Sequence, residues 1–382
     1  MDSTFLIGHL DSGSRPDHPS FNGKIDESIA FNKSGILQNE PLKSSHHSHS
    51  SLSARIIFRD DSYSLPALPA TAKLAAVSIP SRGKTILNFL KGMDFLLGLS
   101  PQIVCMPIGF RKSTPIFYPM ICAFHEKGIL TIVPIGNNGA GNAQVPGCYP
   151  KVISVGAIDA DGKVAKYSGS YLDDSESCLK PDILAAGDSL PIGKQLNKKG
   201  TSFACSYITG IAARLLQAQP LATMEEIKVA LFSSTQSLLP SQSHRCKRGI
   251  VQPEAALEFL LQKKKITSPK LNEVFPSFVD KRYQDRRFVS QFKNATPGQL
   301  LEAIIIPSAS LVTVNDTKIS SPKSQELIFQ IQKSKGVVPE STYFFRHADM
   351  MHVIARSDFF EELLRNPELF SISAVDVNIF EM

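Results

Sequence analysis

At 382 residues and with a formal net charge of +6, the chain is long enough for a large core and a second, smaller domain. Hydrophobic residues make up 42% and charged residues 20%, which is ordinary for a soluble globular protein. No apolar run approaches the roughly 20 residues that a membrane span needs, and residues 1–8 lack the basic region and cleavage site of a secretion signal. We therefore expect a cytoplasmic protein that contacts no membrane.

Cysteine spacing and basic clusters exclude several other classes. The six cysteines contain no CxxC pair, so the sequence predicts reduced thiols and neither a disulfide framework nor a zinc site. Much of the positive charge gathers at residues 245–248, 263–265 and 281–287. We interpret these clusters as a solvated tether and expect no nucleic-acid partner, because no motif of aromatic and basic residues accompanies them.

The first expected element is a strand at residues 4–10, which ends in Asp11 and a Ser-Gly turn. Catalytic groups gather at the carboxyl ends of strands in parallel sheets, so Asp11 is well placed to orient a histidine. Considered alone, Asp11 could simply cap the turn through a local hydrogen bond.

Three histidines lie close together in the segment HHSHSSL, residues 46–52. His46 and His49 are three residues apart and would share one helical face, a spacing that suits a metal ion. No cysteine or carboxylate partner is evident in the sequence, so we expect no metal site here.

Apolar strands and helices then alternate, with strands expected at 74–79, 102–109 and 129–136 and helices at 86–97 and 116–127. Pro107 cannot donate a ladder hydrogen bond, which fits an edge strand. Asn137 follows the last of these strands, and its amide could donate a hydrogen bond to an oxyanion. By itself, however, the Asn-Gly motif there predicts only a turn.

A serine follows a small-residue turn at Gly200 and precedes a long apolar run, the pattern of a nucleophile at the start of a buried helix. Free N–H groups in the first helical turn and the helix dipole favour negative charge beside Ser202, where an oxyanion develops during acyl transfer. An unassisted serine at this position is more often a helix cap.

These segments resemble, in order, the motifs of the subtilisin-like peptidases. GTSFACSYITG resembles the serine motif GTSMAxPHVAG and departs from it at Ser206, where the family usually has proline. LDSG resembles the aspartate motif, QIVCMPIG the cleft strand INMSLG, and GNNG the loop AAGNEG. HHSHSSL aligns with the histidine motif HGTHVAG, which maps the general base onto His46 and leaves His47 in place of glycine. The resemblance covers roughly residues 3–262.

The resemblance implies a doubly wound, mainly parallel α/β sheet with helices on both faces, and a serine endopeptidase that needs no cofactor. Ser202 would attack the peptide carbonyl, His46 would accept and return the proton, and Asp11 would orient the imidazole. Asn137 and the Ser202 N–H would hold the oxyanion. Family members often bind calcium, but no Asp-rich loop identifies a site. The residues implied along the substrate cleft are Pro107, Ile108 and Gly109.

The expected cytoplasmic location and the lack of a prosegment favour a dedicated processing protease that cuts a precursor peptide or a protein. The alternative is a binding module with the same fold and little or no activity, which the departures at His47, Pro107 and Ser206 favour. The presence of all three triad residues favours the enzyme. Loops near 107–109 and 144–146 are expected to shape substrate preference.

The last quarter of the chain lies outside the resemblance. We expect a peptidase domain at 1–262, a basic linker at 263–295 and an α+β domain at 296–382. The strand and helix patterns there follow the order βαββαβ, ending in a strand at 371–380, which predicts a ferredoxin-like domain. Subtilisin propeptides have a similar topology but lie at the N-terminus. We expect this domain to steady the protease or to dock a protein partner or substrate.

Overall fold

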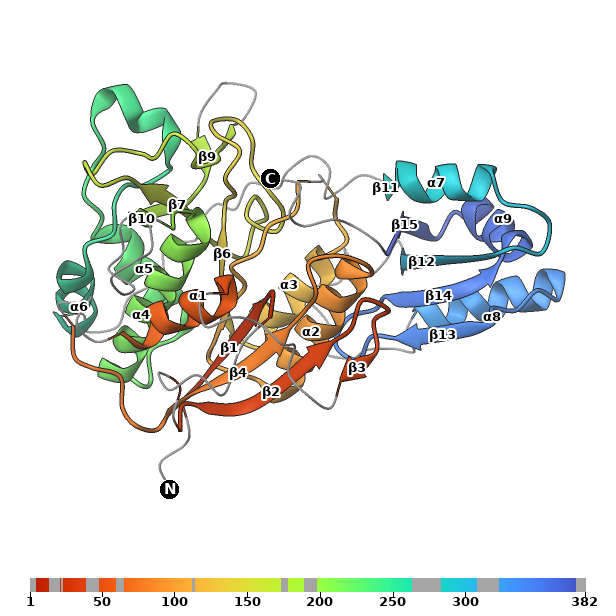
Figure 1. The fold of residues 1–382 in the computed structure, drawn as a ribbon, viewed down its shortest axis with the longest axis horizontal. Coiled ribbons are helices and arrows are strands. Elements are labelled where there is room, and N and C mark those ends of the chain that lie inside the picture. Colours follow the sequence, from red (N-terminus) through yellow and green to blue (C-terminus); the bar gives the residue numbers. More distant parts are fainter. Residues whose placement is uncertain are drawn as a thin grey trace.

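The structure is a computed structural model, and Figure 1 shows a larger body with elements β1 to α6 and a smaller one with β11 to β15. It describes residues 5–13, 21, 23–38, 48–59, 65–111, 114–172, 178–188, 198–262, 283–307 and 323–375.

The larger body contains a twisted sheet in the order β10-β7-β6-β5-β1-β4-β2-β3. Neighbouring strands are parallel, except for β2 and β3 at one edge. The strands are β1 (Phe5–Asp11), β2 (Ile25–Phe31), β3 (Leu37–Gln38), β4 (Ala72–Ser78), β5 (Ile103–Cys105), β6 (Leu130–Pro134), β7 (Ile153–Ile158) and β10 (Ile183–Ala186). The inner strands are nearly continuous apolar runs, because both faces of the sheet are covered.

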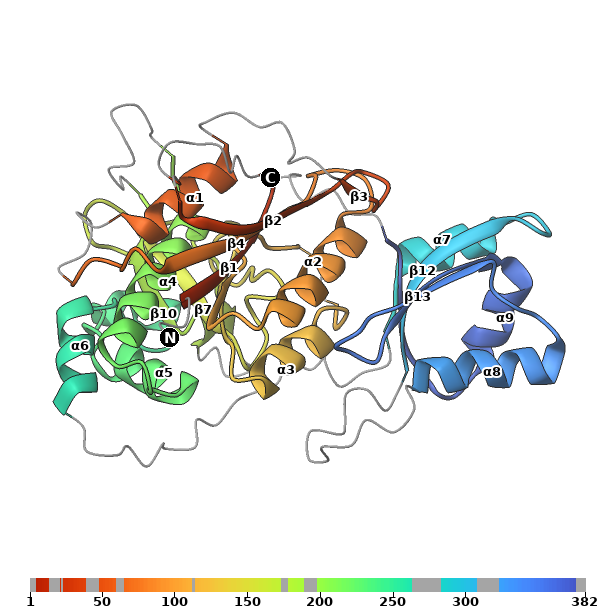
Figure 2. The same cartoon turned by 90° about the horizontal axis from the view of Figure 1, so that it is seen from below.

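Helices cover both faces of this sheet (Figure 2). On one face lie α1 (His49–Phe58), α4 (Thr201–Ala218), α5 (Met224–Ser233) and α6 (Pro253–Gln262), and on the other α2 (Thr85–Leu99) and α3 (Tyr118–Glu126). Alternate residues of β4 belong to the two cores, with Leu74 facing α4 and Val77 facing α2. The predicted α/β architecture is confirmed. None of the described helices combines the length and apolar character that crossing a bilayer requires.

Two short elements complete the larger body. Strands β8 (Tyr171–Leu172) and β9 (Cys178–Lys180) form a small antiparallel pair, and the 3-10 helix η3 (Pro240–Arg245) lies next to β9.

The smaller body is a sheet in the order β11-β15-β12-β14-β13. From β12 onward its elements follow the order strand, helix, strand, strand, helix, strand, as the sequence predicted. They are β11 (Tyr283–Gln284), α7 (Arg286–Lys293), β12 (Leu300–Pro307), α8 (Lys323–Lys335), β13 (Ser341–Phe344), β14 (Met351–Arg356), α9 (Ser357–Arg365) and β15 (Leu369–Ser373). The strand predicted at 371–380 begins earlier, at Leu369, and residues 376–380 of that range lie outside the described residues.

The domain boundary differs from the predicted one. Residues 263–282 of the expected linker lie outside the described residues, but 283–295 contain β11 and α7. Phe288 on α7 is fully buried in the core of the smaller body, against Phe360 of α9. Phe292, one turn further along α7, packs against the same core. The basic residues nearby concealed these anchors, and the C-terminal domain includes residues from Tyr283 onward.

One face of the smaller sheet packs on α2 and α3 of the larger body (Figure 2). Ile304 and Ile306 of β12 join the core beneath these helices, whereas Ile305 faces α8 and α9. At the centre of the contact is Asp94 on α2, which is 4% exposed. Its carboxylate accepts hydrogen bonds from the Arg346 N–H (3.0 Å), the His347 N–H (3.1 Å), the His347 ring (2.9 Å) and the Tyr343 hydroxyl (3.3 Å).

Candidate active site

The candidate site is a cleft at the carboxyl edge of the parallel sheet, where β1, the segment after β5 and the segment after β6 end. The N-termini of α1 and α4 point to the same place, which adds free N–H groups to the strand ends. The cleft is lined by Asp11, His49, Asn137 and Ser202, together with the segment Pro107, Ile108 and Gly109. The structure therefore brings together all the predicted site residues that it describes.

Asp11 and His49 form a buried pair. The His49 Nδ1 lies 2.9 Å from Asp11 Oδ2 and 3.0 Å from Asp11 Oδ1. Asp11 is fully buried, and the His49 side chain is 30% exposed on the cleft side. Burial lowers the pKa of His49, but the charge of Asp11 and its hydrogen bond outweigh burial, so the pKa lies above its usual 6.5. Burial raises the pKa of Asp11, yet the charge and hydrogen bond of His49 leave it below its usual 3.8.

This pair corrects the histidine assignment. His46 lies outside the described residues, and the imidazole on Asp11 is that of His49. The reason is where the helix begins: the Ser48 hydroxyl accepts a hydrogen bond from the Ser51 N–H and caps α1, so His49 is the first helical residue. A histidine at the helix start is what HGTHVAG contains, so the motif aligns from His49. The cap signal of Ser48 was present in the sequence.

Ser202 is the second residue of α4, and its side chain lies at the floor of the cleft with 9% exposure. Its hydroxyl donates to the Pro107 carbonyl at 2.7 Å. Among the described contacts, no hydrogen bond joins Ser202 to His49. Catalytic hydrogen bonds are often absent or long without substrate, and rotation about the Ser202 side chain would be needed to form this one. The Phe203 ring lies 5.4 Å from the His49 ring and packs beside it.

The side-chain amide of Asn137 is held at its oxygen by Thr201. Its Oδ1 accepts hydrogen bonds from the Thr201 N–H at 2.9 Å and the Thr201 hydroxyl at 3.0 Å. The amide nitrogen, a donor, is therefore the end that remains for the cleft. Together with the backbone N–H of Ser202 in the first turn of α4, it supplies two donors suited to an oxyanion.

Beneath the cleft, a chain of buried polar groups joins β1, α1 and α4. His9 Nε2 lies 2.9 Å from the Ser53 hydroxyl, which lies 2.7 Å from the Ser206 hydroxyl, and Ser206 donates to the Ser202 carbonyl at 3.0 Å. All three side chains are fully buried. Ser206, which departs from the family motif, thus forms a hydrogen bond with the backbone of the nucleophile Ser202. Burial lowers the pKa of His9 to about 4.

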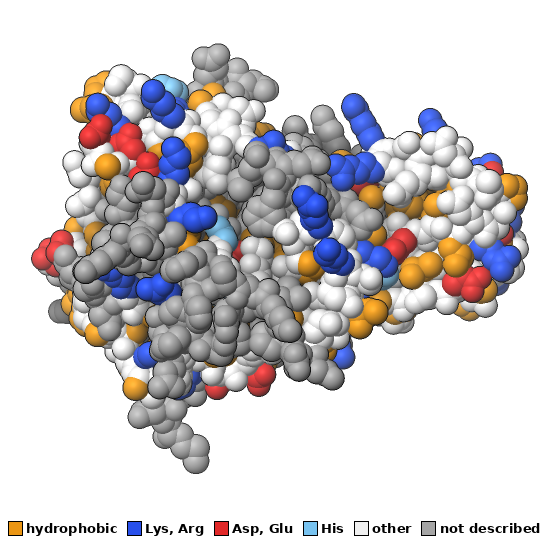
Figure 3. All heavy atoms as spheres, viewed as in Figure 1, with side chains coloured by type: hydrophobic (Ala, Val, Ile, Leu, Met, Phe, Trp, Pro, Cys, Tyr) orange, Lys and Arg blue, Asp and Glu red, His pale blue; other side chains and the backbone are white. Residues whose placement is uncertain are grey.

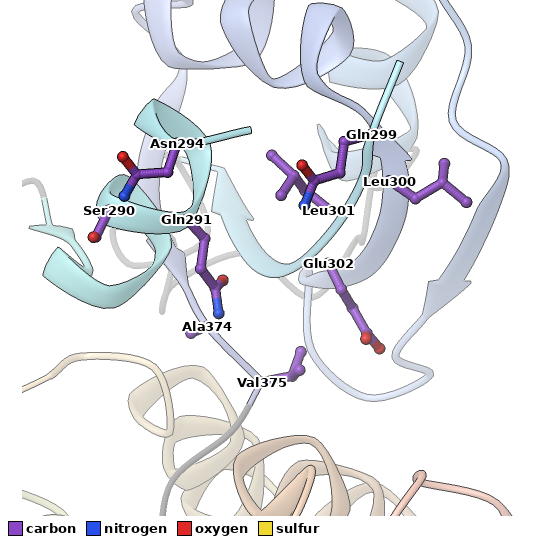
Figure 4. Close-up of a pocket in the computed structure, with 9 residues that line it drawn as sticks. All are labelled: Ser290, Gln291, Asn294, Gln299, Leu300, Leu301, Glu302, Ala374 and Val375. Atoms are coloured by element: carbon purple, nitrogen blue, oxygen red, sulfur yellow. The ribbon is translucent and has the colours of Figure 1, made fainter. Parts of the chain in front are cut away.

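A second hollow, of about 470 Å³, lies in the C-terminal domain between α7, β12 and the end of β15 (Figure 4). Its described lining contains the amides of Gln291, Asn294 and Gln299 but no histidine, cysteine or serine–histidine pair. Glu302 at its edge is held by Lys84 at 2.5 Å and His352 at 2.6 Å. This lining offers no nucleophile with a base, so the chemistry is placed at the cleft of Ser202.

Surface charge and possible metal ligands were compared with the cleft as indications of a second site. Among the described residues, Lys and Arg side chains are scattered over the face shown in Figure 3. Within the described ranges, no group of three or more histidine, cysteine, aspartate or glutamate side chains could hold a metal ion.

The fold and the site together have the form of an α/β serine hydrolase. The model of the subtilase family (Peptidase_S8) matches residues 2–257, and the chain belongs to this family. Subtilisin E of Bacillus subtilis (strain 168) is 24% identical over 264 residues, covering 67% of this chain and 66% of that protein. An intracellular serine protease of Paenibacillus polymyxa is 24% identical over 218 residues, covering 55% of this chain and 66% of that protein.

Solved structures agree on the fold. The prenylagaramide maturation protease PagA superposes with a TM-score of 0.53 at 24% identity, covering 69% of this chain and 95% of that one. The patellamide maturation protease PatA superposes with a TM-score of 0.53 at 23% identity, covering 69% of this chain and 99% of that one. The C-terminal domain exceeds what these matches cover, and the chain spans 66% of the length of the first curated relatives.

Proposed function

We propose that the chain is a serine endopeptidase in which Ser202 is the nucleophile, His49 the general base and Asp11 the group that orients it. The observation that carries this proposal is the buried Asp11–His49 pair at the mouth of the cleft that contains Ser202. A carboxylate fixed on Nδ1 leaves Nε2 as the acceptor for the serine proton.

The reaction begins when the Ser202 hydroxyl leaves the Pro107 carbonyl and turns to His49. Its oxygen attacks the peptide carbonyl while His49 takes the proton, and Asp11 stabilises the imidazolium that forms. The Asn137 amide and the Ser202 N–H donate to the developing oxyanion. His49 then returns the proton to the leaving amine, and water hydrolyses the acyl-enzyme by the same steps. No cofactor takes part.

The substrates we propose are peptides or proteins, and the role is that of a dedicated processing protease in the cytoplasm. Two of the solved relatives, PagA and PatA, are maturation proteases, and one curated relative is an intracellular serine protease. These names support a processing role for this chain.

For the C-terminal domain, we propose a ferredoxin-like fold that steadies the protease. The strand order β15-β12-β14-β13 and the alternating helices support the fold. The buried carboxylate of Asp94 and the shared apolar core support the steadying role. As a second proposal, the C-terminal domain docks a protein partner. The contact between this domain and the larger body forms without such a partner.

The test is covalent labelling of the full chain with an alkyl fluorophosphonate, read by intact mass. Wild type should gain one adduct, Ser202→Ala none, and the exposed control Ser243→Ala one adduct at the wild-type rate. Equal labelling of wild type and Ser202→Ala would place the reactive group elsewhere. No adduct on folded wild type would favour the non-catalytic binding module, in line with the Ser202–Pro107 hydrogen bond.

A further inference from the structure

The floor of the cleft contains one polar side chain that the proposed reaction does not use. Gln144 lines the cleft and is 6% exposed. Its backbone is fixed, because the Gln144 N–H donates to the Ile135 carbonyl at 2.8 Å and its carbonyl accepts from the Cys148 N–H at 3.1 Å. Among the described residues, none forms a hydrogen bond with its side-chain amide, so a donor and an acceptor on this nearly buried residue remain for the cleft.

The Gln144 side chain lies against two glycines, Gly109 and Gly136, which form two walls around it. A Cβ added to Gly109 would lie 2.2 Å from Gln144 Oε1, and one added to Gly136 would lie 2.5 Å from its Cγ. Both walls therefore lack side chains where Gln144 is present. The amide fills a gap that side chains on either wall would otherwise close.

This gap adjoins the reacting groups on both sides. Gly109 is two residues from Pro107, whose carbonyl holds the Ser202 hydroxyl, and Gly136 directly precedes Asn137. Because Gln144 lines the same cleft as Ser202 and Asn137, we expect the side chain next to a carbonyl placed between Ser202 and Asn137 to approach the amide of Gln144.

We propose that Gln144 determines which residue may donate the scissile carbonyl, and that it selects a short, neutral, polar side chain such as serine, threonine or asparagine. This inference rests on the proposed peptidase function. An amide that a bound substrate covers and leaves unpaired is costly, and a substrate hydroxyl or amide pairs with it, whereas an apolar side chain does not. An aromatic side chain is also excluded by volume, because Gln144 occupies the gap.

The experiment uses full-length protein and peptidyl diphenyl phosphonates that differ only in the side chain next to phosphorus: serine, asparagine, leucine or phenylalanine. Each labelling rate is divided by the rate of the same variant with an alkyl fluorophosphonate, which carries no side chain. In wild type, the serine and asparagine probes should react about tenfold or more faster than the leucine and phenylalanine probes.

Two variants separate hydrogen bonding from volume. Gln144→Met keeps the volume, so the polar preference should shrink to about threefold or less while phenylalanine stays excluded. Gln144→Ala opens the gap, so the leucine and phenylalanine rates should rise about tenfold or more. Gln330→Ala, exposed on α8, should retain the wild-type ratios.

Wild-type preference for phenylalanine or leucine would overturn the inference, as would wild-type ratios in both Gln144 variants. Failure of the proposed function looks different, because wild type would then not react with the fluorophosphonate at all.

Discussion

His9 should make the protein acid-sensitive in a defined pH window. Burial lowers its pKa from 6.5 to about 4, the charge of Asp11 opposes this, and the charge of His49 adds to it. Native His9 therefore stays neutral down to about pH 4, whereas in the unfolded chain it binds a proton below about pH 6.5. Because the unfolded state binds more protons in this window, the free energy of unfolding falls as the pH falls from 6.5 to 4.

The size of the effect follows from the pKa difference of about 2.5. One pKa unit corresponds to about 1.4 kcal/mol, so His9 should account for a loss of about 3 kcal/mol across the window. Its neighbours contribute outside this range. Because the pKa of Asp11 is lowered, the stability that Asp11 contributes is lost only below pH 3.8. Because the pKa of His49 is raised, the stability that His49 contributes is fully present below pH 6.5 and is lost at higher pH.

The assay is urea unfolding of wild type and His9→Gln between pH 4 and 7. Circular dichroism serves as the probe because the chain has no tryptophan. His9→Gln keeps a polar group near Ser53 but cannot titrate, so between pH 6.5 and 4 it should lose about 3 kcal/mol less than wild type. Parallel pH dependence in the two proteins would refute the account of His9 as a buried neutral side chain.

Two further predictions concern the oxyanion donor and the domain interface. Asn137→Ala should lower turnover of a peptide substrate about 10²–10³-fold without lowering the unfolding midpoint much, and unchanged turnover would remove Asn137 from the oxyanion site. Asp94→Ala removes the buried carboxylate that accepts from the N–H groups of Arg346 and His347, and it should destabilise the protein by about 1–2 kcal/mol in urea unfolding. The control Asp161→Ala, on an exposed turn, should change stability little, and equal losses in both variants would count against the buried contact.

Local patterns in the sequence were sufficient for much of the fold and part of the site. The apolar strand before Asp11 and the small-residue helix after Gly200 are features of consecutive residues, so their positions could be predicted. Parallel strands end at one edge, which is why Asp11, Asn137 and Ser202 meet in the structure as the motif order implied.

Other features depend on contacts between distant segments and could not be predicted in this way. The histidine that meets Asp11 depends on where Ser48 caps α1, and three histidines in four positions made the motif alignment ambiguous. The loop at 144–146 was expected to shape substrate preference, but only the structure shows that the Gln144 side chain lies against two glycines from separate segments. Phe288 and Phe292 lie four residues apart on α7, and two apolar anchors within a short basic segment were too few to predict a helix of this domain.

The measurement that tests the central claim most directly is the rate of fluorophosphonate labelling of wild type, His49→Ala and His46→Ala across pH 5–9. Wild-type labelling should rise with pH through the pKa of His49, which lies above 6.5, because only the neutral imidazole accepts the serine proton. His49→Ala should be slower by about 10²–10⁴-fold and lose this pH dependence, while His46→Ala should match wild type. Loss of labelling in His46→Ala with retention in His49→Ala would contradict the account.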